Sequence, residues 1–362
     1  MARNRVIYQS EALFVSEDAS FTGANKNVQL ERVQSANFSY TINRQDINQF
    51  GELARIDSII MDPPTVSTDF SYYLTDGFNE RALGFAVETG HGITPSNFAS
   101  GQMISSSGIN AYIVTAPEGI DINTDGAIGA TDTVIGIGNC YVTDYSVDMS
   151  VGSIPTASVS MEAANVRSDV AGGAIDNPAI DQEAGTARGG IITLPTPSAG
   201  GSAIKALRPG DIEVTLTNFD GDTVADLVGL DGAHVQSVGI SLPLSRSPID
   251  RLGSRFPFAR EVDFPVNVSM SISAIVNETT AFQLADKLTA SANSAKVTLK
   301  DKDGDPALIW ELSGAKVDSE SFSTSIGSNQ SVDLTLSAQV GGTNDVTNGL
   351  FLSGSSQVQP FS

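Results

Sequence analysis

Hydrophobic and polar residues alternate with a period of two in eight segments of the chain, four in each half. In the first half, one side of the segments carries Ala36, Phe38, Tyr40 and Ile42; Val66, Thr68, Phe70, Tyr72 and Leu74; Tyr141, Thr143, Tyr145, Val147, Met149 and Val151; and Ala157, Val159, Met161 and Ala163. In the second half, the corresponding residues are Val238, Ile240, Leu242 and Leu244; Val268, Met270, Ile272 and Ala274; Phe322, Thr324 and Ile326; and Val332, Leu334, Leu336 and Ala338. This alternation predicts β-strands with one buried face, so the protein is expected to be mainly β.

The two sets of segments belong to an internal repeat. Residues 33–74 match residues 235–276 at 11 of 42 positions when the offset is 202, where unrelated sequences would share about two or three. A second block, around the predicted hairpin turns at 152–153 and 327–328, matches at an offset of 175. The same face stays apolar in both copies, although a slip of one residue would turn a strand over. We infer two copies of one domain.

The repeat predicts the domain boundaries. The first domain, with an N-terminal arm, is expected at 1–166, followed by a Gly- and Pro-rich linker at 167–204, a second domain at 205–342 and a C-terminal arm at 343–362. One short helix is expected in each domain. Residues 279–290 place several apolar side chains near one helical face behind a threonine cap. Its counterpart in the first copy would pass through Phe98 and Met103.

The polar sides of the strands carry short hydroxyl side chains and scattered carboxylates, without Lys or Arg. The residues selected as candidates on this face are Ser67, Asp69, Ser71, Asp144, Asp148, Glu162, Ser271, Ser323 and Asp333. A smooth, weakly negative wall suits a wide aqueous channel that a polyanion crosses without adhering. The alternative is a plain solvated sheet face that happens to be rich in serine.

The overall charge limits the partners that the chain can hold. The formal net charge is −22, whereas tight binding of nucleic acid needs many Lys and Arg side chains. Tight binding of nucleic acid is therefore not expected.

The lone Cys140 forms no intrachain disulfide. The first residues lack the apolar core of a secretion signal, and no stretch is apolar enough to span a membrane.

Several runs resemble the major tail tube proteins of long-tailed bacteriophages. The runs are 4–13 (NRVIYQSEAL), 39–51 (SYTINRQDINQFG), 63–67 (PPTVS) and 206–212 (ALRPGDI), so the resemblance spans both copies and the linker. In that family each domain contributes four long strands and a flanking helix. Six domains close a ring whose inner wall is a 24-stranded β-barrel, and some members fuse two domains so that a trimer makes the ring. The doubling of this chain is similar to that variant.

The resemblance implies a structural role in a virion. Two homologous β-barrel or sandwich domains, each with a short helix, would form trimeric, pseudo-hexameric rings that stack into a helical tail tube. The partners would be other copies of the chain, the tape measure protein, tail terminator and tail tip or baseplate proteins, and passing double-stranded DNA without specific binding. The tube would be assembled in the host cytoplasm, and the candidate polar residues would line its lumen during genome ejection.

A short acidic segment fits the pattern of a calcium loop. Asp121, Asn123, Asp125 and Asp132 occupy positions 1, 3, 5 and 12, with Gly126 at position 6. The loop resembles that of dockerin modules more than that of EF-hands, because position 12 is Asp. The alternative is an Asx-rich turn. No cofactor is expected to be required, and calcium is the ion that this loop would take.

The sequence offers no catalytic constellation. His91 and His234 lie at non-equivalent places in the two copies, and no phosphate-binding glycine loop or nucleophile–His pair is present. We therefore expect a protein that is not an enzyme. Two alternatives to a tube subunit stay open. They are another phage structural protein, such as a baseplate hub or decoration protein, and a calcium-stabilised two-domain β-sandwich binding module.

Overall fold

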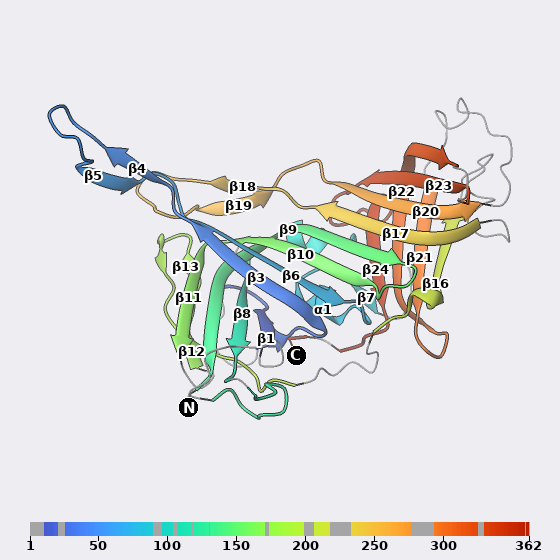
Figure 1. Ribbon diagram of the computed structural model, residues 1–362, viewed down its shortest axis with the longest axis horizontal. Coiled ribbons are helices and arrows are strands. Elements are labelled where there is room, and N and C mark those ends of the chain that lie inside the picture. The colour runs from blue at the N-terminus through green and yellow to red at the C-terminus, as the bar shows by residue number, and fades with distance from the viewer. Residues whose placement is uncertain are drawn as a thin grey trace.

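The computed structural model describes most of the chain. The described residues are 11–20, 26–89, 96–103, 108–117, 119–129, 131–170, 174–198, 206–217, 233–276, 293–324, 329–358 and 360–361. The prediction of a mainly β protein is confirmed, since long strands dominate and the described helices are short. Figure 1 shows a layer of long strands above a layer of shorter, steeper strands.

Eight strands form the long layer. Their order across the sheet is β22 (Pro306–Ser323), β23 (Ser331–Gln339), β20 (Asn267–Val276), β17 (Ala233–Pro243), β9 (Thr133–Ser150), β10 (Thr156–Ala163), β6 (Thr65–Tyr73) and β3 (Val33–Thr41). All neighbours are antiparallel. We call this eight-stranded section the long sheet.

The same strand order occurs in both halves of the long sheet. The first half reads β9–β10–β6–β3 and the second reads β22–β23–β20–β17. Both β3 and β17 carry a bulge at the same place of the repeat, at Gln34 and at Gln236. Each of these glutamines donates from Nε2 to the backbone carbonyl two residues earlier. The repeat therefore extends to local backbone irregularities.

The strands β9 and β22 connect the two layers, because each is 18 residues long and bends from one layer into the other. The first halves of these strands pair with the lower layer. In copy one that layer contains β1 (Glu11–Ser16), β2 (Asn27–Gln29), β8 (Ile109–Thr115) and β11 (Asn165–Val170). In copy two it contains β16 (Ile212–Thr217), β21 (Asn293–Lys300) and β24 (Gly349–Gly354), and β24 also pairs with β7 (Glu88–Thr89).

The core lies between the layers and crosses from one copy to the other. Phe98 stacks on Phe85 with ring centroids 4.2 Å apart, and it meets Trp310 of the second copy edge-on at 4.9 Å. The helices α1 (Phe78–Ala82) and α2 (Ser100–Met103) supply neighbouring buried positions. Burial of such aromatic side chains is the main source of stability.

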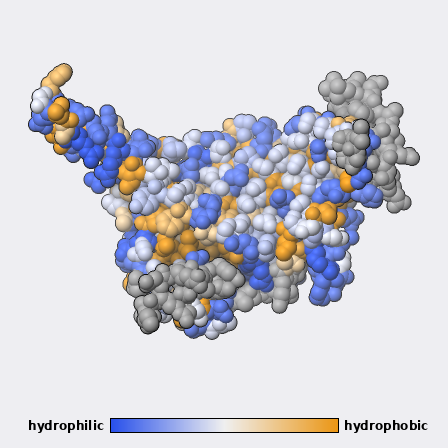
Figure 2. Space-filling model, viewed as in Figure 1, coloured by the Kyte–Doolittle hydropathy of each residue, from blue (hydrophilic) through white to orange (hydrophobic). Residues whose placement is uncertain are grey.

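Two hairpins project from the same end of the long sheet. The first is β4 (Arg44–Ile47) with β5 (Asp57–Ile60), and the second is β18 (Arg246–Ile249) with β19 (Ala259–Val262). We call them the first arm and the second arm. The first arm reaches beyond the body at the upper left of Figure 1, whereas the second runs along the body. Figure 2 shows hydrophobic residues at the tip of the first arm.

The structure differs from the sequence predictions at several places. The segment 167–204, predicted as an irregular linker, contains β12 (Ala174–Asp176), β13 (Ile180–Asp181), β14 (Thr186–Ala187) and β15 (Ile191–Thr193), which pair as two small ladders. The C-terminal arm holds β24, which pairs within its own chain. The structure also has the helix α1 and a short 3-10 turn, η2 (Pro209–Asp211), which the alternation does not predict. The helix predicted at 279–290 lies outside the described residues.

One predicted strand face is wrong at its first residue. The alternation assigns Tyr141 to the face of Tyr145, but β9 has a bulge at Thr143. The bulge places Tyr141 opposite Glu162, on the other face, because one extra residue reverses the alternation. Tyr141 is nevertheless buried there, covered by the second arm. No helix in the described part of the chain is long and apolar enough to cross a membrane.

Candidate functional site

The candidate site is the polar face of the long sheet. All nine residues selected from the sequence lie on strands of this sheet, at exposed or half-exposed positions of one face: Ser67, Asp69, Ser71, Asp144, Asp148, Glu162, Ser271, Ser323 and Asp333. The opposite face packs on the lower layer and is buried, as at Val66, Phe70, Val159 and Ile272. The alternation of short polar and large apolar residues thus puts the candidate residues on one continuous surface.

A row of serines crosses this face from strand to strand. The row runs through Ser35, Ser71, Ser158, Ser146, Ser241, Ser269 and Ser337, each directly opposite the next. Ser35 Oγ and Ser71 Oγ are 2.7 Å apart, and Ser39 Oγ and Ser67 Oγ are 2.8 Å apart in a parallel row. Hydroxyl groups that bond to one another leave a short, smooth surface.

Carboxylates interrupt the hydroxyl rows. Asp69 Oδ2 accepts a hydrogen bond from Asn37 Nδ2 at 2.9 Å, and Glu162 forms an ion pair with Arg260 of the second arm. Partial burial raises the pKa of Asp144. Lys316 is an exception to the acidic character of this face. It lies opposite Ser337, at the end of the serine row. The sequence pattern does not single out Lys316, because the regular polar side of that strand begins only at Ser319.

Two edges of the long sheet lack a neighbouring strand among the described residues. One is the outer edge of β3, and the other is the outer edge of the second half of β22. On β3 the exposed fractions of Phe38 and Tyr40 are 36% and 63%. Their repeat equivalents on β17, Ile240 and Leu242, are 2% and 0% exposed, because β9 of copy one covers that edge. The exposed apolar residues of β3 therefore occupy positions that are buried in the other copy.

The internal joint between β17 and β9 is reinforced by the second arm. The guanidinium of the buried Arg246 donates to the carbonyl oxygens of Val142 at 3.2 Å, Arg260 at 3.3 Å and Gln102 at 2.9 Å. It also lies 5.1 Å from the centroid of the Tyr141 ring. Burial lowers the pKa of Arg246, although the group stays positively charged at neutral pH. This arginine links the arm, β9 and α2.

The side chains of two of the four predicted calcium ligands make other contacts in the structure. Asn123 Oδ1 accepts from Gln29 Nε2 at 2.8 Å, and Asp132 Oδ2 accepts from the backbone N–H of Gly129 at 2.6 Å. Asp121 and Asp125 are exposed. In the ranges that the structure describes, no group of three or more His, Cys, Asp or Glu side chains could hold a metal ion. Calcium binding by this loop stays a prediction.

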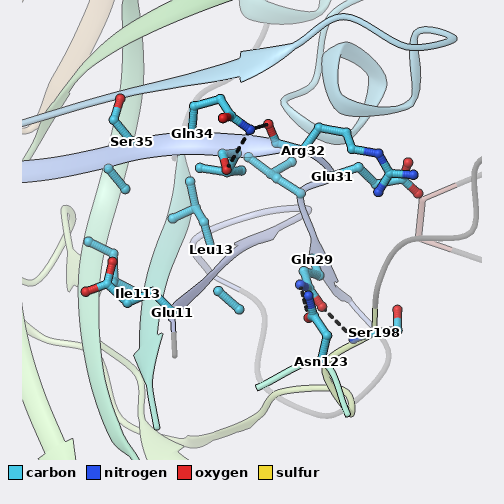
Figure 3. A pocket seen from close by; sticks show the side chains of 14 residues that line it. Glu11, Leu13, Gln29, Glu31, Arg32, Gln34, Ser35, Ile113, Asn123 and Ser198 are labelled. Atoms are coloured by element: carbon cyan, nitrogen blue, oxygen red, sulfur yellow. Dashed lines mark hydrogen bonds between the residues drawn. The ribbon is translucent and has the colours of Figure 1, made fainter. Parts of the chain in front are cut away.

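A pocket of about 360 Å³ lies below the start of β3. Figure 3 shows Gln29 inside it, bonded to Asn123 and to the backbone of Ser198. The rest of the lining mixes apolar side chains such as Leu13, Leu30 and Ile113 with polar ones. The pocket contains neither histidine nor cysteine, and it belongs to the side of the molecule where the edge of β3 is open.

The comparisons with known proteins assign the chain to no family. No protein-family model matches it, and no curated protein matches its sequence. Among solved structures, a chain of the anti-feeding prophage baseplate is 15% identical to this chain, with a TM-score of 0.29. The match covers 40% of this chain and 93% of the baseplate chain. A chain of the tube-terminating cap of that prophage is 10% identical, with coverage of 39% and 88% and a TM-score of 0.26. The Hcp protein is 11% identical, with coverage of 38% and 96% and a TM-score of 0.21.

Proposed function

We propose that this protein is the structural subunit of a phage-type tail tube, in which three chains close into a ring around a channel for DNA. The observation that carries the proposal is the pair of open edges on an eight-stranded sheet whose free face is polar. Exposed edges invite pairing with another chain, and closure removes them. Because the two edges differ, the contact is head-to-tail, and such a contact generates a ring when the rotation from one chain to the next closes.

Three chains give a suitable channel. Eight strands from each of three chains make 24, and such a barrel with strands tilted by roughly 40° measures about 48 Å between opposite backbones. Two chains would give 16 strands and about 32 Å, which leaves little room for a DNA double helix and its water once side chains project inward. The larger ring leaves space for a DNA double helix and its water. The serine rows and carboxylates would face that space and repel phosphate weakly.

The two arms favour stacking of rings into a tube. Phe50 and Leu252 are equivalent in the repeat, lie at the arm tips and are fully exposed. Apolar tips on one side of a ring would bury themselves against the next ring, and a head-to-tail contact that does not close builds a filament. The partners of the tube would be the tape measure protein inside it and terminator and baseplate proteins at its ends. The protein would then be part of the virion tail, assembled in the host cytoplasm, with a structural rather than a catalytic role.

Negative-stain electron microscopy and sedimentation velocity of the purified full chain test this function. We expect three-fold rings with six lobes and a hollow centre, or striated tubes, and a species of about 113 kDa for three chains of 37.7 kDa each. Monomers at every concentration and salt condition would contradict the proposal. Closed rings of a different chain number would favour a baseplate or decoration protein instead.

A further inference from the structure

The internal joint between the two copies provides a template for a joint between chains. At this joint Ile240 lies opposite Val147, Ser241 opposite Ser146 and Gly239 opposite Asp148. Subtracting the offset of 202 from the β17 residues gives positions on β3. Adding the offset of 175 to the β9 residues gives positions on β22. The three resulting pairs are Phe38 with Phe322, Ser39 with Ser321, and Asn37 with Ser323.

The backbones of both open edges match those of the template. The strand β9 has a bulge at Thr143, between Val142 and Asp144, and β22 has one at the equivalent Asp318. The bulges of β3 and β17 likewise coincide in the repeat, as described above. A bulge shifts every later pair of a ladder by one residue. Because both edges carry the same irregularities as the template, the same register can form between them.

Burial supports the same pairing. Phe322 on β22 is 38% exposed, whereas its equivalent Val147 is buried at the internal joint. Phe38 and Phe322 would thus become neighbours on the apolar face, and both are more exposed than their equivalents Ile240 and Val147. Ser39, Ser321, Asn37 and Ser323 would meet on the polar face, so the joint preserves the two-sided character of the sheet.

We propose that β3 of one chain adds to the second half of β22 of another copy in this register, with Phe38 opposite Phe322. The proposal rests on the proposed ring and extends it by specifying which residues meet where one chain ends and the next begins. The occupant of both edges is a second copy of this chain, because the open edges of two copies offer each other the bulges and the apolar positions of the internal joint.

Paired cysteines test the register in the full chain. Ser39→Cys with Ser321→Cys, and Asn37→Cys with Ser323→Cys, are the in-register variants. Facing Cα atoms in an antiparallel pair lie about 4.5–5.5 Å apart, which a disulfide can span. The exchanged variants, Ser39→Cys with Ser323→Cys and Asn37→Cys with Ser321→Cys, place the thiols at diagonal positions about 7–8 Å apart, beyond that range.

Background reactions are limited by the fold. Within one chain, β3 and β22 are at opposite sides of the eight-stranded sheet, about 33 Å apart at ordinary strand spacing, so a disulfide between them must join two chains. The native Cys140 is buried, and burial raises the pKa of its thiol to about 12, which keeps it unreactive.

After mild oxidation, we expect covalent dimers and trimers on a non-reducing gel for the two in-register variants, at least 10-fold more than for the exchanged variants. Assembly of the unmodified protein is measured in parallel by sedimentation. If the chain assembles and the exchanged variants cross-link equally or better, or no variant cross-links, the register is wrong while the ring stands. If the unmodified chain does not assemble and no variant cross-links, both the register and the proposed function fail.

Discussion

At the scale of single residues, Glu80 is the most unusual group in the core. It is fully buried on α1, and its Oε1 accepts hydrogen bonds from Tyr72 Oη at 2.9 Å and from Tyr145 Oη at 3.0 Å. Removal from water raises the pKa of Glu80, and burial also raises the pKa of both tyrosines well above the ordinary value. The two donated hydrogen bonds favour the charged carboxylate and lower its pKa, but the effect of burial is larger, so the pKa of Glu80 stays raised.

The raised pKa predicts a pH dependence of stability. A raised folded-state pKa stabilises the protein fully below the unfolded pKa, and this contribution is lost as pH rises through the folded pKa. Glu80→Gln keeps a neutral acceptor for both tyrosines. We expect the variant to gain stability relative to the natural protein as pH rises above 4.5, by about 1.4 kcal/mol for every pH unit that separates the folded pKa from the unfolded one. Urea unfolding from pH 4 to 8, followed by Trp310 fluorescence, measures it.

The exposed Glu52 supplies the matched control for this experiment. Glu52→Gln removes the same charge from the tip of the first arm, where the side chain is in solvent. We expect its stability difference from the natural protein to stay small across the pH range. A constant difference for Glu80→Gln as well would contradict the assignment of a raised pKa to Glu80.

Arg44 and Arg246 are the same residue of the repeat in two environments. Arg246 is buried with its hydrogen bonds satisfied, whereas the guanidinium of Arg44 is exposed and has no hydrogen bond or ion pair to any residue that the structure describes. We expect Arg246→Ala to lower the free energy of unfolding by about 1–3 kcal/mol. We expect Arg44→Ala to leave it unchanged within about 0.5 kcal/mol.

The same substitution at Arg44 should weaken assembly. In a second copy, Val317 would offer the carbonyl that Val142 offers to Arg246, although Lys316 replaces the Tyr141 ring. We expect a roughly 10-fold rise in the concentration needed for assembly, equivalent to one lost hydrogen bond to a charged group. Sedimentation across concentration measures this value, and an unchanged value would exclude Arg44 from the joint.

At the scale of elements, the strand β3 pairs with β6 on one side and has an open outer edge on the other. Its equivalent β17 differs in being covered by β9, so the two strands allow a comparison of the same position with and without a neighbour. The apolar residues of β3 contribute little to the stability of one chain while they stay in solvent. Their contribution should appear when chains associate.

Serine substitutions separate the two contributions. We expect Leu242→Ser to lower the free energy of unfolding by about 2–5 kcal/mol, because it removes a fully buried side chain. Tyr40→Ser should change that free energy by less than about 0.5 kcal/mol but reduce ring formation strongly. Thermal unfolding and class averages of the rings measure both effects. Equal destabilisation by the two substitutions would show that β3 is already covered in the monomer.

At the scale of the whole molecule, the polar face should decide how assembled tubes treat DNA. Natural tubes are expected not to retain duplex DNA, since the face offers carboxylates and hydroxyls. Replacing Asp69, Asp148 and Asp333 by Lys should make tubes retain DNA in low salt, and the retention should fall steeply as salt rises. Filtration of labelled duplex DNA with purified tubes measures the effect.

The control for this experiment changes the charge elsewhere. Lysine at Asp125, Asp303 and Asp305 alters the net charge by the same amount, but these exposed residues lie on loops away from the long sheet. We expect little retention by the control tubes. Equal retention by both variants would show that net charge, and not the polar face, controls the behaviour toward DNA.

The sequence predicted the elements of the long sheet well, because each depends on local alternation. Each of the eight predicted segments overlaps a strand of the long sheet, and Ser67, Asp148 and Asp333 lie on the expected polar side. The segment predicted at 322–326 is a strand only as far as Ser323, and Ile326 lies outside the described residues. The bulge at Thr143 escaped prediction, since nothing in the local pattern distinguishes an extra residue from a regular strand. The buried position of Arg246 at the joint between the copies was also not predicted. The signal that could have indicated it is that the repeat has arginine at this position in both copies, as Arg44 and Arg246.

The sequence by itself determined the doubled β architecture and the face of most strand side chains, because local alternation and repetition specify both. The face of Tyr141, beyond the bulge at Thr143, is the exception. The tertiary structure alone decided how the copies join. Burial depends on what lies across a sheet edge, and Leu242 is covered while the equivalent Tyr40 is open. The sequence treats these two positions alike, since the neighbour that distinguishes them comes from a segment about 100 residues away or, as proposed here, from another chain.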